Sequence, residues 1–151
     1  MVLLSLLMLN ARVVADWGYE EIDYTMAILN TSYPGSVERP DELGKFSEGH
    51  VGAASGLLVH VQSVNSTTDH ACTLPLRAVG GQALPHNGEP WIALIRRGQC
   101  SYEQKVDNAY KSNASAVLIF NDRESTVLQK MKVNTHSKYS LIAVVNLTQK
   151  D

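Results

Sequence analysis

The side chains able to perform acid–base, metal or nucleophilic chemistry are scattered along this chain. No HExxH pattern occurs, and no two histidines stand four residues apart, as a zinc site on a helix would need. Ser55 lies between glycines, but it lacks the GxSxG register and precedes an apolar run instead of following one. Asp69 and His70 adjoin, yet adjacency in a loop does not build a catalytic dyad. We therefore expect no catalytic residue, no metal and no cofactor; the histidines are His50, His60, His70, His86 and His136.

The two cysteines, Cys72 and Cys100, form neither a CxxC pair nor a zinc pattern with histidine. In an oxidising compartment they would pair and close a loop of about 28 residues. The chain-entropy model assigns such a loop roughly 3 to 4 kcal/mol of stabilisation. Residues 72–90 show no helical or strand periodicity for about 20 residues, which is unusual inside a compact domain. A disulfide would hold that irregular segment at both ends.

The N-terminus resembles a secretory leader. Residues 1–9 are apolar but too few to span a bilayer, and Val13, Val14 and Ala15 precede Asp16 as a signal peptidase site requires. A buried N-terminal strand, or the remnant of a longer leader, is the alternative. We predict a signal peptide over residues 1–15 and a single domain over residues 16–151.

Four N-glycosylation sequons favour the same luminal or extracellular address. They begin at Asn30, Asn65, Asn113 and Asn146. Asn65, in an expected loop, is the first candidate for a glycan and Asn30 is the second.

Charge excludes one class of partner. The net charge is -2, the isoelectric point is near 6.2, and the basic residues Lys130, Lys132 and Lys138 are sparse. Such a surface is typical of a solvated edge, so we expect no nucleic-acid partner.

The elements that would position these residues centre on residues 91–121. Apolar runs over 91–95 and 116–120 predict two strands, and Ser101 with Gln104 three residues later predicts a capped helix between them. Tyr102, Val106, Ala109 and Tyr110 would share one face of that helix. The result is a βαβ unit with parallel strands.

Further strands are expected over residues 24–28, 56–64 and 141–145. The polar segment before Gly52 predicts a loop with at most one helical turn, anchored by Lys45 and Phe46. Residues 125–132 could hold a short helix or an irregular segment. His60 would point away from the better apolar face of its strand, so it is either a solvent-facing or partly covered side chain or, less simply, a ligand.

The central stretch also carries a family pattern. WIALIRRGQCSYEQK over residues 91–105, Ala109, and AVLIFN over residues 116–121 together resemble the protease-associated (PA) domain. The resemblance is closest to the luminal PA domain of Goliath/GRAIL-type transmembrane RING ubiquitin ligases, which Cys72 before a Pro-containing loop also fits. It extends over residues 56–145 and is only general over residues 16–55. It implies a mixed α/β fold: an open β-barrel or sandwich flanked by helices and containing the βαβ unit.

The resemblance implies a non-catalytic domain that recruits substrates or partners for a RING-type ligase whose RING domain lies outside this sequence. Its partners would be luminal or extracellular segments of membrane proteins, and it would reach the membrane only through a parent segment absent here. The parent would reside in endosome, ER or Golgi membranes. A further helix and strand would follow Val145 in this family. The alternatives are a lid or spacer of a protease or receptor, and a free secreted binding protein.

The large candidate anchors for a partner are Trp17, Tyr33, Phe46 and Tyr102, the last more simply a core residue.

Asn113 has two interpretations. The family pattern commonly has glycine here, and asparagine can adopt the left-handed conformation that ends a helix. Its sequon is the competing interpretation, and we favour the cap.

Overall fold

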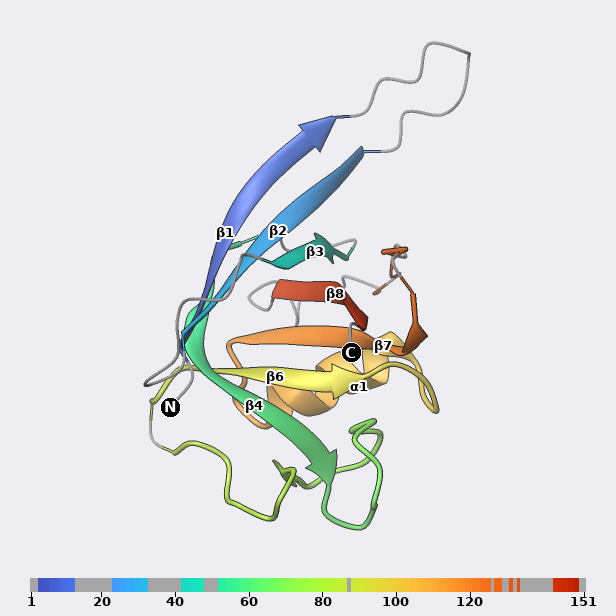
Figure 1. The fold of residues 1–151 in the computed structure, drawn as a ribbon. Coiled ribbons are helices and arrows are strands. Elements are labelled where there is room, and N and C mark those ends of the chain that lie inside the picture. The colour runs from blue at the N-terminus through green and yellow to red at the C-terminus, as the bar shows by residue number, and fades with distance from the viewer. Residues whose placement is uncertain are drawn as a thin grey trace.

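The computed structural model describes residues 3–12, 23–32, 42–47, 52–86, 88–125, 127–128, 131, 133 and 143–149. These residues form eight strands and one helix (Figure 1). The mixed α/β class expected from the sequence is confirmed. The elements are β1 (Leu3–Arg12), β2 (Asp23–Ser32), β3 (Glu42–Phe46), β4 (Ser55–Ser63), β5 (Leu76–Ala78), β6 (Trp91–Arg96), α1 (Tyr102–Lys111), β7 (Ala116–Glu124) and β8 (Ala143–Gln149).

The sheet order is β1-β2-β3-β8-β7-β6-β4-β5, and β1 also pairs with β4. Seven of the strands therefore form a closed ring, and β5 extends from β4 outside it. The closing contact pairs Leu3 with Leu57 and Ser5 with Ser55 in antiparallel register. The resemblance implied an open β-barrel or sandwich flanked by helices; in the described residues β1 closes the ring of strands against β4, and one helix flanks it.

Strands β4, β6, β7 and β8 are parallel neighbours. The predicted βαβ unit is thus confirmed as β6, α1 and β7, with Ile92 opposite Ala116 and Arg96 opposite Phe120. Because parallel strands end on the same side of a sheet, the segments that follow β4, β6 and β7 converge there.

Two hydrophobic clusters fill the faces of this sheet. Alternate residues of β6 supply both, as expected for a strand covered on each side. Trp91, Ala93 and Ile95 pack with Val106 and Ala109 of α1, whereas Ile92 packs toward the β2 and β3 side with residues that include Leu29 and Phe46. Figure 1 shows α1 lying along β6 and β7.

Two local expectations fail. Residues 42–46 form strand β3, not a loop, because pairing with both β2 and β8 supports a short segment that contains Gly44. Phe46 is 3% exposed, so it anchors this strand as predicted and is unavailable to a partner. The inward face of α1 is also rotated: Tyr110 is exposed, and Lys105 is buried instead.

Strand β1 falls within the predicted signal peptide, and residues 13–15 with the cleavage position lie outside the described residues. Leader removal therefore stays a prediction. Trp17, Tyr33, Lys130, Lys132 and Lys138 also lie outside the described part. Within the described residues, no helix is long and apolar enough to cross a membrane. Between β7 and β8, Met131 and Val133 are buried in the α1-side cluster.

Candidate functional site

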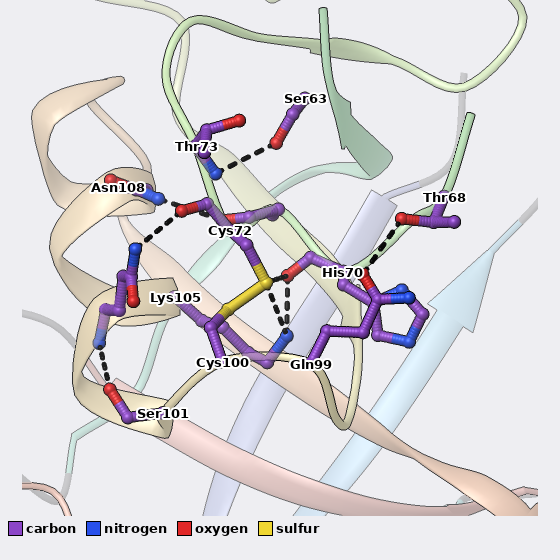
Figure 2. The surroundings of a disulfide bond; sticks show 12 residues. Ser63, Thr68, His70, Cys72, Thr73, Gln99, Cys100, Ser101, Lys105 and Asn108 are labelled. Atoms are coloured by element: carbon purple, nitrogen blue, oxygen red, sulfur yellow. Dashed lines mark hydrogen bonds between the residues drawn. A yellow bond between two sulfur atoms is a disulfide. The ribbon is translucent and has the colours of Figure 1, made fainter. Parts of the chain in front are cut away.

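The segment from Val64 to Pro75, here called the disulfide loop, joins β4 to β5 at the carboxyl ends of the parallel strands. Cys72 within it is bonded to Cys100, 28 residues later, with Cα atoms 5.8 Å apart. Cys100 follows β6 and immediately precedes the N-cap residue of α1. The bond therefore joins the loop to the entrance of the helix (Figure 2).

Side chains of α1 hold the same loop by its main chain. Gln104 Nε2 donates to the oxygen of Cys72 at 2.7 Å, and Lys105 Nζ donates to the oxygen of His70 at 2.6 Å. Asn108 Nδ2 donates to the oxygen of Ala71 at 2.9 Å. One helix thus binds three successive carbonyls of the loop. No local pattern in the sequence predicts these contacts.

The opposite side of the disulfide loop is fixed by β4. The Thr73 N–H donates to Ser63 Oγ of β4 at 3.0 Å, as Figure 2 shows. At the base of the loop, the Val64 N–H donates to the oxygen of Pro75 at 2.9 Å. Ala71 has a φ of 53°, a left-handed conformation that non-glycine residues adopt at some cost. Both neighbouring elements, α1 and β4, therefore constrain the loop.

Hydrogen bonds at the two caps of α1 set where the helix begins and where it ends. Ser101 Oγ accepts from the Gln104 N–H at 3.2 Å, which confirms the predicted N-cap. The Gln104 side chain does not complete the capping box, because it binds Cys72 instead. Asn113 has a φ of 64° and its N–H donates to the oxygen of Tyr110, so the C-terminal cap interpretation is also confirmed.

Lys105 is the unusual charge of this site. Its side chain is fully buried, and its Nζ lies 3.9 Å from Cys72 Sγ as well as against the His70 oxygen. Burial lowers the pKa of Lys105 to about 8, and the opposing attraction of Asp69 only partly offsets this effect. Lysine is rarely buried without partners, so its contacts to the loop are part of the fold.

A second polar group, the Asp69 cluster, consists of His60, Asp69, Arg96 and Phe120. His60 Nε2 and Asp69 Oδ2 are 2.8 Å apart, and Arg96 Nε lies 2.8 Å from Asp69 Oδ1. Arg96 Nε makes no hydrogen bond, so its contact with Asp69 Oδ1 is an ion pair alone. The Arg96 guanidinium lies 5.4 Å from the Phe120 ring centroid, and the His60 ring meets Phe120 edge to face.

Electrostatics in the Asp69 cluster favour the ionised carboxylate. Burial alone would raise the pKa of Asp69, but hydrogen bonds from His60 and from the main chain, and then Arg96, lower it below its ordinary value of 3.8. The His60 side chain is 39% exposed, within the simpler interpretation of a solvent-facing or partly covered residue.

His70 does not pair with the neighbouring Asp69 carboxylate. Its Nδ1 is buried without a hydrogen-bond partner, and burial followed by repulsion from Lys105 lowers the pKa of His70. The Asp69–His70 pair therefore forms no dyad, in line with the sequence argument. His86 is exposed, whereas His50 and His136 lie outside the described residues.

Nothing else in this region supplies obvious reactive chemistry. Both cysteines are used in the disulfide, so no free thiol is present. Within the described ranges, no three histidine, cysteine, aspartate or glutamate residues are grouped as a metal site would need. The arrangement is a loop held by the disulfide, α1 and β4, together with the buried Lys105 and the partly covered Asp69 cluster.

Comparison with known proteins identifies the family. Residues 54–151, most of the chain, match the family model of the PA domain. The chain belongs to the PA domain family. The resemblance seen in the sequence, WIALIRRGQC through AVLIFN, is thereby confirmed, and the disulfide loop lies within the matched residues.

Relatives of this PA domain are RING finger proteins. RING finger protein 150 of Danio rerio is 33% identical over 108 residues, which cover 68% of this chain and 24% of that protein. RING finger protein 150 of Mus musculus is 52% identical over 44 residues, covering 29% of this chain and 10% of that protein. E3 ubiquitin-protein ligase RNF149 of Mus musculus is 35% identical over 80 residues, covering 53% and 20%. The chain thus matches a quarter or less of each relative's length.

Among solved structures, an aminopeptidase from Aneurinibacillus sp. strain AM-1 aligns with a TM-score of 0.40 and 22% identity. The alignment covers 99% of this PA domain and 29% of that chain.

The sequons of this PA domain occupy different settings. Asn65 is exposed in the disulfide loop, Asn30 is exposed on β2, and Asn113 is exposed at the end of α1. Asn146 lies in β8. Exposure of Asn65 suits a glycan, and its occupancy stays a prediction.

Proposed function

We propose that this PA domain is the non-catalytic recognition part of a transmembrane RING-type E3 ubiquitin-protein ligase. It faces the lumen or the outside of the cell and recruits luminal or extracellular segments of membrane proteins. The observation that carries this proposal is the similarity to RING finger protein 150 over 68% of the chain. The ligase activity belongs to a RING domain elsewhere in the parent protein.

The disulfide loop is the part of the domain best suited to recognition. Val64 is 40% exposed and Leu74 is 42% exposed, although both are large apolar residues. The main chain between them is held by the Cys72–Cys100 bond and by α1. A loop that is already ordered loses little conformational entropy on binding, so apolar side chains on it can contribute affinity efficiently.

The disulfide also supports the compartment. Disulfides persist in the secretory pathway and outside the cell, and are rare in the cytosol. The predicted leader and the sequons are consistent with a luminal domain of an endosomal, ER or Golgi membrane protein. We expect no nucleic-acid partner.

The recruitment role can be tested by a chimera. The matched region of RING finger protein 150 is replaced by this chain, and ubiquitinated membrane proteins are quantified in cells by mass spectrometry. We expect Val64→Ser with Leu74→Ser to lower ubiquitination of the substrates that depend on the PA region, with self-ubiquitination unchanged. Val127→Ser is the matched control, because Val127 is 65% exposed but lies beyond β7.

Two results would overturn the proposal. One is an unchanged substrate set when the whole PA region is deleted from the chimera. The other is ubiquitin transfer by the purified chain alone with E1, E2, ubiquitin and ATP, since the domain would then carry its own catalytic activity.

A further inference from the structure

One sulfur of the disulfide has a buried ammonium group beside it. Lys105 Nζ lies 3.9 Å from Cys72 Sγ, and the Lys105 side chain is fully buried. A cation within about 4 to 6 Å stabilises an anion and lowers the pKa of its acid by roughly 1 to 3 units. If the disulfide opens, this position favours a thiolate at Cys72.

The two cysteines are both partly exposed. Both chain neighbours of Cys100, Gln99 and Ser101, are exposed. On the Cys72 side, the preceding residue Ala71 is buried and the following residue Thr73 is exposed. Figure 2 shows Lys105 reaching toward Cys72 from the helix that begins just after Cys100. The feature that distinguishes the two sulfurs is the Lys105 ammonium group beside Cys72.

Opening the disulfide would not release the loop. Gln104, Lys105 and Asn108 bind three consecutive loop carbonyls, and Ser63 binds the loop from β4. None of these hydrogen bonds needs the sulfur–sulfur bond. We expect the reduced loop to keep these contacts and to hold the two sulfurs close enough to join again.

We propose that Cys72–Cys100 is a thiol–disulfide exchange site whose substrate is a thiol reductant, with Cys100 as the attacked sulfur and Cys72 as the leaving thiolate beside Lys105. This inference goes beyond the recognition role and does not depend on it.

The thiolate of the reductant forms a bond to Cys100 Sγ, the Cys72–Cys100 bond breaks, and the electron pair remains on Cys72 Sγ. A second thiolate then attacks the reductant's sulfur in the mixed disulfide and releases Cys100 as a thiolate, which takes a proton from water. The reductant leaves as a disulfide, and the protein has gained two electrons.

The equilibrium between oxidised and reduced chain tests the role of Lys105. The protein is incubated in buffers of defined reduced-to-oxidised glutathione ratio, then alkylated and measured by intact mass. We expect Lys105→Met to need a ratio on the order of tenfold higher for half reduction, because the thiolate loses its cation. Lys111→Met is the matched control on the same helix, since Lys111 is exposed and pairs with Asp107. A Lys105→Met midpoint within twofold of the unaltered chain would overturn the proposal.

A second measurement does not depend on how well Lys105→Met folds. In a Cys100→Ser variant that retains Lys105, thiolate absorbance near 240 nm should titrate with a Cys72 pKa below the free value of about 8.5. A pKa at or above that value would contradict the proposed leaving group.

The attacked sulfur can also be mapped. Reduced glutathione added to the oxidised chain and quenched early with acid should give a mixed disulfide at Cys100 in the peptide map, and attachment at Cys72 would refute the assignment. The reduced chain should keep a cooperative urea transition. Its loss would show that the loop needs the bond, and that reversible exchange does not occur.

Discussion

The side chain of Asn108 donates a hydrogen bond of 2.9 Å to the main-chain oxygen of Ala71, 37 residues earlier in the chain. Asn108 is 6% exposed, so water cannot replace this contact freely. The bond ties the βαβ unit to the disulfide loop independently of the cysteines. It therefore contributes to stability even when the disulfide is open.

We predict that Asn108→Ala lowers the free energy of unfolding by about 1 to 3 kcal/mol, because the buried Ala71 oxygen loses its donor. Urea unfolding of the oxidised protein measures the loss. Lys111→Ala, at an exposed ion pair on the same helix, should cost less than about 0.5 kcal/mol. Equal losses for the two variants would mean that the Asn108 contact contributes nothing beyond the helix itself.

The sequence predicts the βαβ unit well because its signals are local. Apolar runs define β6 and β7, and Ser101 and Asn113 mark the two ends of α1. Strand β3 was missed because its few residues include Gly44, and its pairing with β2 and β8 is visible only in three dimensions.

The candidate site was predicted only in part. Two lone cysteines suffice to suggest a bond between Cys72 and Cys100. Lys105 and Asn108 look like ordinary polar helix residues, and their burial depends on a loop more than thirty residues away. The contact of His60 with Asp69 likewise needs a strand and a loop to meet, which no periodicity encodes.

The pH dependence of stability should reveal the Asp69 cluster. The pKa of Asp69 lies below 3.8 in the folded chain and near 3.8 in the unfolded chain, so above pH 3.8 its ionised form stabilises the fold. This stabilisation is lost as the pH falls through the folded pKa. The difference in melting temperature between the unaltered chain and Asp69→Asn should therefore shrink between about pH 6 and about pH 2.

A second variant separates this effect from general acid unfolding. His60→Gln removes the first hydrogen-bond donor that lowers the Asp69 pKa, so the same melting-temperature difference should become less dependent on pH. A pH-independent difference for Asp69→Asn would show that the carboxylate gains no stabilisation on folding.

Gly56 should not tolerate a side chain. A Cβ atom there would lie 2.4 Å from the Pro90 oxygen, which also accepts the Leu57 N–H at 3.0 Å. The main chain of Pro90 cannot rotate away as a side chain could, so β4 and β6 would have to separate. We predict that Gly56→Ala costs about 1 to 3 kcal/mol or more in urea unfolding. Ser55→Ala, at the exposed neighbouring residue, should stay within about 0.5 kcal/mol.

Glycosylation should distinguish Asn65 from Asn113. Asn65 is exposed in the disulfide loop, whereas Asn113 is held at a φ of 64° as the cap of α1. Oligosaccharyl transfer needs an accessible and adaptable chain, so we predict that Asn65→Gln removes one increment of gel mobility from secreted material. Asn113→Gln should leave the mobility unchanged. Unchanged mobility for Asn65→Gln would refute the assignment.

The N-terminus of the secreted chain decides between a leader and a retained strand. Strand β1 pairs with β2 from Leu3 to Arg12 and with β4 at Leu3 to Ser5, so it closes the ring of strands. We predict from the sequence that a signal peptidase cuts after Ala15, and N-terminal sequencing of secreted protein should then begin at Asp16. In that product β2 loses its neighbour β1. The amides of β2 should then exchange with deuterium faster than those of β6, because β6 keeps β4 and β7 on its two sides. A secreted product that begins at Met1, with protected β2 amides, would show that the apolar segment is a structural strand of the mature domain.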